Sequence, residues 1–145
     1  MKGVVVKIDL SKAYDRVNWL YIHLLQTHLG FHIDFIRWIM SCITTVSFVI
    51  LINGVASHFF HAERGLRQGF PLSPLLFLLV AEGLSKFPKK AHSDGDFRGI
   101  YVSQALAITH LLFVDDILIF CDGSRRRLQN YVRVWIFFTS LLVWS

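Results

Sequence analysis

Three aspartates lie where an acidic side chain is costly, because each one interrupts an apolar segment. Asp9 ends the run Val4–Ile8, in which four of the five residues are apolar, and the pair Asp115 and Asp116 divides the apolar run 111–120. Adjacent like charges in a half-buried strand pair repel one another, and burying them is expensive. Aspartate favours turns, so we expect the pair to form the tip of a β-hairpin.

A divalent cation would relieve this repulsion. If the strand that ends at Asp9 lies beside the hairpin, the carboxylates of Asp9, Asp115 and Asp116 converge on one point. Such a point suits Mg²⁺, which takes hard oxygen ligands and keeps positions open for phosphate oxygens. Two ions about 4 Å apart can activate an attacking hydroxyl and hold the leaving oxygens of a phosphoryl transfer. The spacing alone leaves two other interpretations open: a plain surface turn for the pair, and a strand end or helix cap for Asp9.

Local signals before residue 63 predict the elements that would position Asp9. Asn18 is a good N-cap for a helix that ends at Gly30. Asn53 and Gly54 together are a strong hairpin signal between two strands. The expected elements are a buried strand at 3–9, helices at 18–30 and 32–43, and strands at 46–52 and 56–62.

The second half of the chain predicts a long helix followed by strands. Ser73 is expected as an N-cap and Pro74 as the first helical residue. This helix is apolar on all sides, so we expect it to be buried on most of its circumference and to end near Pro88. The further elements expected are loops at 63–71 and 89–99, strands at 100–103, 107–114 and 117–121, and a last helix at 125–144.

This order of elements predicts an α+β fold in which helices cover one face of an antiparallel sheet. Of the 145 residues, 54% are hydrophobic and 17% are charged, which excludes intrinsic disorder. The longest uncharged apolar stretch, residues 38–52, is shorter than the roughly 20 residues of a membrane span and contains polar side chains. We therefore expect no membrane segment, and a chain that is intracellular without a visible targeting signal. Cys42 and Cys121 are expected as two buried thiols, and the net charge of +5 permits a polyanionic partner.

Three ordered blocks give the chain a resemblance to a known family. Residues 7–19 read KIDLSKAYDRVNW, residues 65–74 read GLRQGFPLSP, and residues 110–116 read HLLFVDD. They resemble the palm motifs of reverse transcriptases, specifically those of non-LTR (LINE-type) retroelements. Their order and separation also fit, and together they span about residues 3–121.

The resemblance implies a polymerase palm with an antiparallel sheet of the split βαβ type, as in ferredoxin-like and RNA-recognition domains. It implies RNA-directed DNA synthesis: two Mg²⁺ ions, or Mn²⁺ in their place, would promote nucleotidyl transfer onto a primer 3′ hydroxyl. The partners would be an RNA template, a DNA primer and deoxynucleoside triphosphates. Asp9 and Asp115 would be the principal metal ligands, and Asp116 an auxiliary carboxylate.

Four more residues take roles from the resemblance. Tyr14 would close the floor under the nucleotide sugar and exclude a 2′-hydroxyl, and Ala13 would leave the backbone open to the triphosphate. Gln68 and Gly69 would line the nucleotide and template side. Core packing for Tyr14 and a loop hydrogen bond for Gln68 are the plainer alternatives.

The chain also departs from the family pattern. Phe70 and Val114 are bulkier than the residues that the family usually has at these positions. By the resemblance, the fingers would precede Met1, and the thumb would follow Ser145, with an endonuclease elsewhere in a longer polyprotein. We therefore expect residues 1–145 to form one partial palm domain, from a retrotransposon whose protein can act in the nucleus, and to be inactive alone. A decayed, non-functional retroelement fragment and an RNA-binding module of similar fold are the alternatives.

Overall fold

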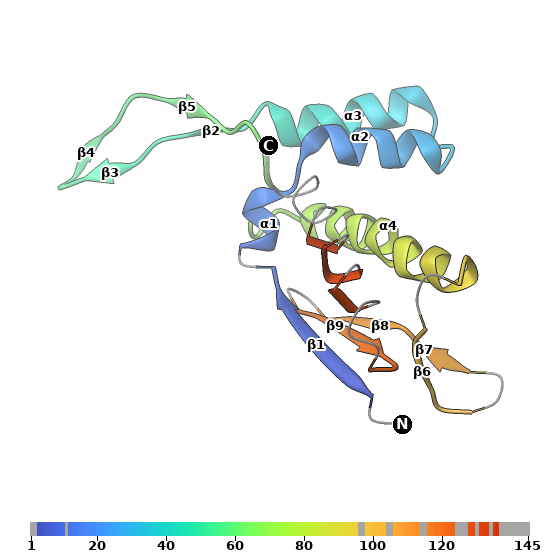
Figure 1. Ribbon diagram of the computed structural model, residues 1–145. Coiled ribbons are helices and arrows are strands. Elements are labelled where there is room, and N and C mark those ends of the chain that lie inside the picture. The colour runs from blue at the N-terminus through green and yellow to red at the C-terminus, as the bar shows by residue number, and fades with distance from the viewer. Residues whose placement is uncertain are drawn as a thin grey trace.

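The computed structural model describes residues 3–10, 12–95, 98–103, 106–113, 116–123, 128–129, 131–133 and 135–136 (Figure 1). The chain forms a mixed α/β structure with small antiparallel sheets. Its elements are β1 (Val4–Asp9), α1 (Ala13–Arg16), α2 (Trp19–His28), α3 (Ile33–Thr44), β2 (Ser47–Phe48), β3 (Leu51–Ile52), β4 (Val55–Ala56), β5 (Phe60–His61), α4 (Ser73–Ser93), β6 (Ile100–Tyr101), β7 (Ala107–Ile108), β8 (His110–Phe113) and β9 (Asp116–Cys121).

A three-stranded antiparallel sheet with the strand order β1-β9-β8 carries the first and third sequence blocks. Side chains alternate across it: Ile117 and Ile119 of β9 are buried, while the residues between them are half-buried. The predicted strand at 3–9 is confirmed, but its predicted burial is wrong. Residues of β1 alternate between half-buried and exposed because helices cover only one face of the sheet.

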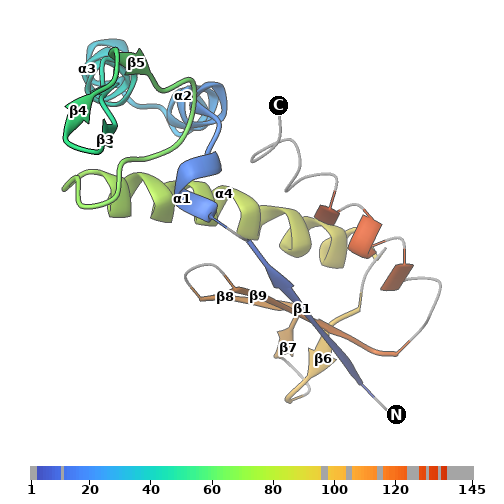
Figure 2. The same cartoon turned by 90° about the vertical axis from the view of Figure 1, so that its left-hand side faces the viewer.

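Helix α4 lies across the covered face of the sheet, and α2 and α3 lie beyond it (Figure 2). The described residues of segment 128–136 are helical and lie on the same face of the sheet as α4. One core cluster joins these layers, including Val80 of α4, Ile119 of β9 and Trp135. The rest of the predicted helix at 125–144 falls outside the described residues.

The predicted start of α2 is confirmed, and the leucines of this helix divide between a buried and an exposed side. The side chain of Asn18 accepts hydrogen bonds from the backbone N–H groups of residues 20 and 21, at 2.8 and 3.4 Å. Leu25 is buried, whereas Leu20 and Leu24 are exposed. The buried side of α2 is the side that faces α4. A Cβ added to Gly83 of α4 would lie 3.2 Å from the Leu25 side chain.

The predicted turn at Asn53 and Gly54 is also confirmed, since both residues have positive φ angles of 50° and 82°. The strands around it form two short pairs, β2 with β5 and β3 with β4, instead of two continuous strands. This hairpin projects from the rest of the chain as an arm (Figure 1). We use "the arm" for residues 46–62, which contain no Lys, Arg, Asp or Glu.

Helix α4 corrects three predictions. Ser73 lies inside the helix, and its hydroxyl donates a 2.6 Å hydrogen bond to the carbonyl of Arg67 instead of capping. The helix continues past Pro88 to Ser93, because Pro88 is buried and Ala91 still packs against the core. Leu78 is 65% exposed, so part of the circumference is open: α2 and the sheet cover only two sides.

Two further sequence expectations have different outcomes. Cys121 is buried as predicted, but Cys42 is exposed on α3, so only one of the two thiols belongs to the core. Among the helices in the described part of the chain, none is long and apolar enough to cross a membrane.

Candidate active site

Two of the three predicted carboxylates lie opposite each other. Asp9 is the last residue of β1 and Asp116 the first of β9, and their Cα atoms are partners in the antiparallel register. Both side chains alternate with residues that face the core, so they lie on the uncovered face of the sheet. The predicted placement of the Asp9 strand beside the hairpin is thus observed, while Asp115 and Val114 fall outside the described residues.

Lys7 lies on the same face, two residues before Asp9, and sequence reasoning missed it. Its Nζ is 2.8 Å from Oδ2 of Asp116. This hydrogen bond, followed by the charge of Asp116 and then that of Asp9, raises the pKa of Lys7 above its ordinary value. The period of two along a strand could have indicated that Lys7 shares a face with Asp9.

The donor set at this end of the sheet fits a hard divalent cation. Two carboxylates face each other across a strand pair, and an ammonium group already bonds to one of them. Carboxylate oxygens are the ligands that Mg²⁺ prefers. Within the described ranges, no three His, Cys, Asp or Glu side chains gather as a metal site, and Asp115 is not among these residues.

Helix α1 follows β1 directly and carries Ala13 and Tyr14. Ala13 is buried against the core. Tyr14 is half-buried and stacks on Phe77 of α4, with ring centroids 4.5 Å apart and planes inclined by 14°. The ring therefore helps to hold α1 against α4, which is the packing role that the sequence left open. Its predicted role under a nucleotide sugar stays a prediction.

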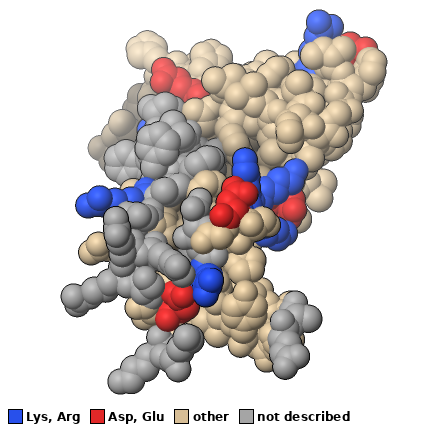
Figure 3. All heavy atoms as spheres, turned by 45° about the vertical axis from the view of Figure 1, so that its right-hand side comes forward, with Lys and Arg blue, Asp and Glu red and all other residues tan. Residues whose placement is uncertain are grey.

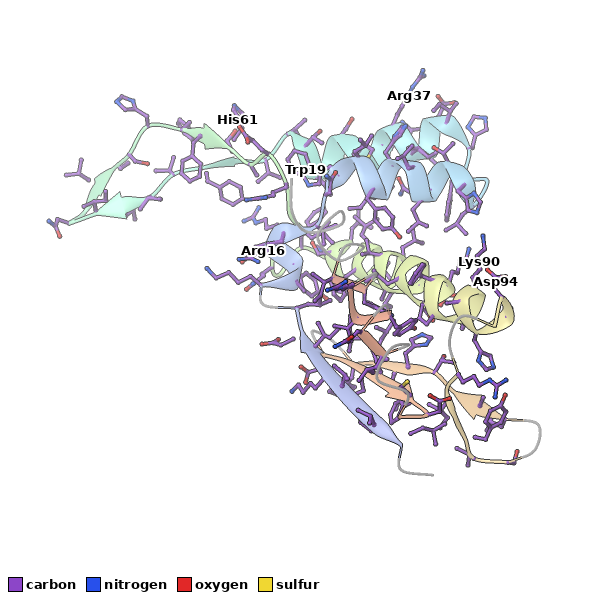
Figure 4. The ribbon with its side chains drawn as sticks, in the orientation of Figure 1. Arg16, Trp19, Arg37, His61, Lys90 and Asp94 are labelled. Atoms are coloured by element: carbon purple, nitrogen blue, oxygen red, sulfur yellow. The ribbon has the colours of Figure 1, made fainter. Side chains whose placement is uncertain are left out.

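The loop of the second block is bound to the end of the first block by backbone contacts. The N–H of Gly65 donates to the carbonyl of Val17 (2.8 Å), and the N–H of Leu66 donates to the carbonyl of Tyr14 (2.7 Å). The indole N–H of Trp19 donates to the carbonyl of Gly65 (2.7 Å). Trp19 lies where α2 begins, near the base of the arm (Figure 4). The first two sequence blocks are therefore one structural unit.

A cavity of about 460 Å³ lies between this loop, the last turn of α1, the start of α2, the end of α3 and the base of the arm. Its lining includes Gln68, Phe70 and two arginines, but not Asp9 or Tyr14. Guanidinium groups suit phosphates, and aromatic rings suit nucleobases. Of its remaining lining residues, Asp15, Trp19, Gly65, Leu66 and Arg67 lie within the first two sequence blocks. Sequence reasoning missed Cys42, Ile43, Val46, Phe48, Ala62 and Arg64, most of which come from separate parts of the chain. Gly69 lies at the edge of this loop with φ +81°, and a Cβ there would meet no atom within 4 Å.

His110 begins the third block and connects the sheet to α4. Its Nε2 is 2.7 Å from the Ser85 hydroxyl, and its Nδ1 is 2.9 Å from the Thr109 hydroxyl. Burial, with a smaller contribution from Lys89, lowers the pKa of His110 below its ordinary value. The ring is therefore neutral in the folded chain near pH 7, and its hydrogen bonds serve the packing of β8 on α4.

Comparison with known families identifies the chain. The family described as "Reverse transcriptase (RNA-dependent DNA polymerase)" matches residues 1–139. The chain belongs to the reverse transcriptase family. The three sequence blocks all lie within this match, so the predicted resemblance is confirmed. Reverse transcriptases generally use divalent metal ions, in agreement with the donor set around Asp9 and Asp116.

Individual reverse transcriptase relatives place the chain among retrotransposable elements. It is 30% identical over 118 residues to the Retrovirus-related Pol polyprotein from type-1 retrotransposable element R2 of Popillia japonica. It is 27% identical over 139 residues to the corresponding polyprotein from type-2 retrotransposable element R2DM of Drosophila melanogaster. The matches cover 81% and 95% of this chain but only 19% and 12% of the two polyproteins.

A third similar protein is comparable in length to this reverse transcriptase chain. An uncharacterized mitochondrial protein of Arabidopsis thaliana is 41% identical over 95 residues, which cover 64% of this chain and 74% of that protein. The predicted relationship to a non-LTR retroelement therefore rests on the two Pol polyproteins and on the family match.

Proposed function

We propose that residues 1–145 form a partial palm domain of an RNA-directed DNA polymerase, which adds nucleotides to a primer 3′ hydroxyl. The observation that carries the proposal is the pairing of Asp9 with Asp116 on an uncovered sheet face, in a chain of this family. Two carboxylates directly opposite each other on a strand pair repel, and a cation relieves this repulsion, so their pairing favours a metal site over a plain turn.

The strand order supports a palm of the split βαβ type. After β1 come the helices α1 to α3 and the arm, and then α4 lies across the sheet. The hairpin of β8 and β9 follows α4 later in the chain, and β9 pairs antiparallel with β1. A helical segment after β9 lies on the same face as α4. This arrangement leaves the opposite face, with Asp9 and Asp116, open for a long substrate.

The proposed roles of the site residues follow from their positions. Asp9 and Asp115 would hold two divalent ions, Mg²⁺ or Mn²⁺, with Asp116 as an auxiliary ligand. Bound there, the ions would lower the pKa of the primer hydroxyl and stabilise the charge on the transferred phosphate. The three carboxylates would hold the two ions in place. The pairing of β1 with β9 fixes Asp9 opposite Asp116.

The remaining proposed site residues belong to the nucleotide. Tyr14 would limit the space at the sugar by its bulk, and the small side chain of Ala13 would leave room for the triphosphate. Gln68 and Gly69 would face the nucleotide and the template, and Gln68 lines the same cavity as Phe70 and the two arginines.

The proposed partners are an RNA template, a DNA primer and deoxynucleoside triphosphates, and the proposed site of action is the nucleus. Part of the open sheet face is apolar: Phe113 is 76% exposed, and Val5 and Leu111 are about half exposed. Such a face can contact the sugars and bases of a duplex beside the carboxylates. Because the Pol polyproteins are several times longer, we propose that other parts of a longer protein hold the primer and template.

A chimera tests this function. The matched segment of the Popillia japonica polyprotein is replaced by this chain, and primer extension on an RNA template is measured with Mg²⁺ or Mn²⁺. We expect extension by the chimera and none by the isolated chain, because lost positioning of the substrates removes several kcal/mol of transition-state stabilisation. Asp115→Asn should reduce extension by the chimera at least about 100-fold.

Two results would contradict the proposal. One is a folded chimera that does not extend primers, which would favour a decayed fragment. The other is an active chimera whose rate is unchanged by Asp9→Asn and Asp115→Asn. Glu82→Gln is a matched control, because it also neutralises one carboxylate but lies exposed on α4.

A further inference from the structure

The contact between Lys7 and Asp116 places a positive charge at the proposed metal site. Lys7 is 60% exposed and Asp116 is 37% exposed, and their charged atoms are 2.8 Å apart. Exposed ion pairs of this kind contribute little to stability. The position of this pair is what distinguishes it, because Asp116 lies directly opposite a second carboxylate, Asp9.

Without a cation, two facing carboxylates at a strand end repel each other. The Lys7 ammonium neutralises one of them and is close enough to Asp9 to interact with its charge as well. Lys7 belongs to the same strand as Asp9 and lies on the same face, so the strand itself delivers this charge to the site. The ammonium group thus occupies Oδ2 of Asp116, a carboxylate oxygen of the kind that a divalent ion binds.

A divalent ion that binds Asp116 must compete with this ammonium for Oδ2. The Lys7 side chain can leave, because it is flexible and mostly exposed, and its ammonium group is held by an ion pair at its end. Resting on the proposed function, we propose that Lys7 is a positioning residue that holds Asp116 in the metal-free protein and competes with the divalent ion. Lys7 therefore lowers the affinity of the site for metal while keeping the metal-free site assembled.

Binding of Mn²⁺ alone to the full chain tests this inference, with free Mn²⁺ measured by electron paramagnetic resonance. Lys7→Met should bind Mn²⁺ roughly three- to tenfold more tightly than the unchanged chain, because one repelling charge near the ion is removed. The ratio of the two Mn²⁺ affinities should shrink as the salt concentration rises, because salt screens the charge of Lys7. Lys7→Arg keeps the charge and should bind like the unchanged chain.

Lys86→Met is the matched control. It removes the same charge from an exposed position on α4, which covers the opposite face of the sheet, and it should leave Mn²⁺ affinity unchanged. Circular dichroism of each variant shows whether the fold is retained. Lys7→Gln also removes the charge and gives a second test if Lys7→Met does not fold: Mn²⁺ binding equal to or weaker than that of the unchanged chain would overturn the inference.

The outcomes separate this inference from the proposed function. If Asp9→Asn weakens Mn²⁺ binding but Lys7→Met binds like the unchanged chain or more weakly, the competing role of Lys7 is wrong and the metal site stands. If the unchanged chain does not bind Mn²⁺, or if Asp9→Asn does not alter Mn²⁺ binding, the proposed metal site and the competing role of Lys7 are both overturned.

Discussion

His110 is held between two hydroxyl groups at the boundary between the sheet and α4. Its lowered pKa makes stability depend on pH. As the pH falls through the ordinary histidine value of 6.5, the unfolded chain takes up a proton that the folded chain does not. The free energy of unfolding should therefore fall between about pH 7 and the lower pKa of the folded state, as urea unfolding at several pH values would show.

The contribution of His110 is separated from that of other groups by a variant. His110→Gln can still hydrogen-bond to Ser85 but does not titrate, so its stability should fall less over the same pH range. If the free energy of unfolding fell equally with pH in the two proteins, His110 would not be the residue responsible.

Asn18 is the second residue whose side chain has a defined local role. Its Oδ1 accepts the first free N–H groups of α2. Asn18→Ala should lower the free energy of unfolding by about 1 kcal/mol in urea titrations, because the N–H groups lose this acceptor. Asn18→Asp keeps the acceptor and should stay within about 0.5 kcal/mol of the unchanged chain, and a large loss for Asp would point to another role.

Among the elements, the loop 63–70 is fitted closely to α1. Gly65 has φ +91°, and a Cβ there would be 2.5 Å from the carbonyl oxygen of Asp15. Gly65→Ala should therefore lower the free energy of unfolding by roughly 3–5 kcal/mol, because strain in the backbone adds to the clash.

Gly69 in the same loop is the control for this prediction. It has a similar φ of +81° but open space around the position of a Cβ, so Gly69→Ala should cost only about 1–2 kcal/mol. Both values come from urea unfolding curves. Equal costs for the two variants would show that the contact between the loop and α1 contributes nothing.

At the scale of the whole molecule, much apolar surface is open. Phe59 and Leu51 of the arm are 77% and 71% exposed, and Leu75 of α4 is 61% exposed. On the face in Figure 3, charged side chains form small mixed groups between wide areas without Lys, Arg, Asp or Glu. Surfaces of this kind promote association.

We therefore expect the purified chain to associate as its concentration rises, in light scattering measurements. Leu51→Lys combined with Val55→Lys should reduce association without changing the fold, because both side chains are exposed at the tip of the arm. Thr27→Lys with His28→Lys adds charge on exposed α2 positions outside the arm and should have a smaller effect. A monodisperse monomer at all concentrations would contradict the prediction.

The features that the sequence determined by itself depend on residues close together in the chain. Asn18 caps α2, and Asn53 with Gly54 forms the turn of the arm, because the side chain or backbone freedom that each feature needs belongs to those residues. The position of Asp9 at the end of β1 and the three motif blocks were likewise local patterns, and the family match confirmed the family that the blocks predicted.

The tertiary structure decided which side chains are buried, because burial depends on the side from which another element packs. It placed Leu25 in the core and left Leu20 exposed, because α4 covers only one side of α2. It also brought Lys7 to Asp116 across 109 positions of the chain, through the antiparallel register of β1 and β9. A strand pattern shows which residues share a face, but only the pairing of strands determines which charges meet on that face.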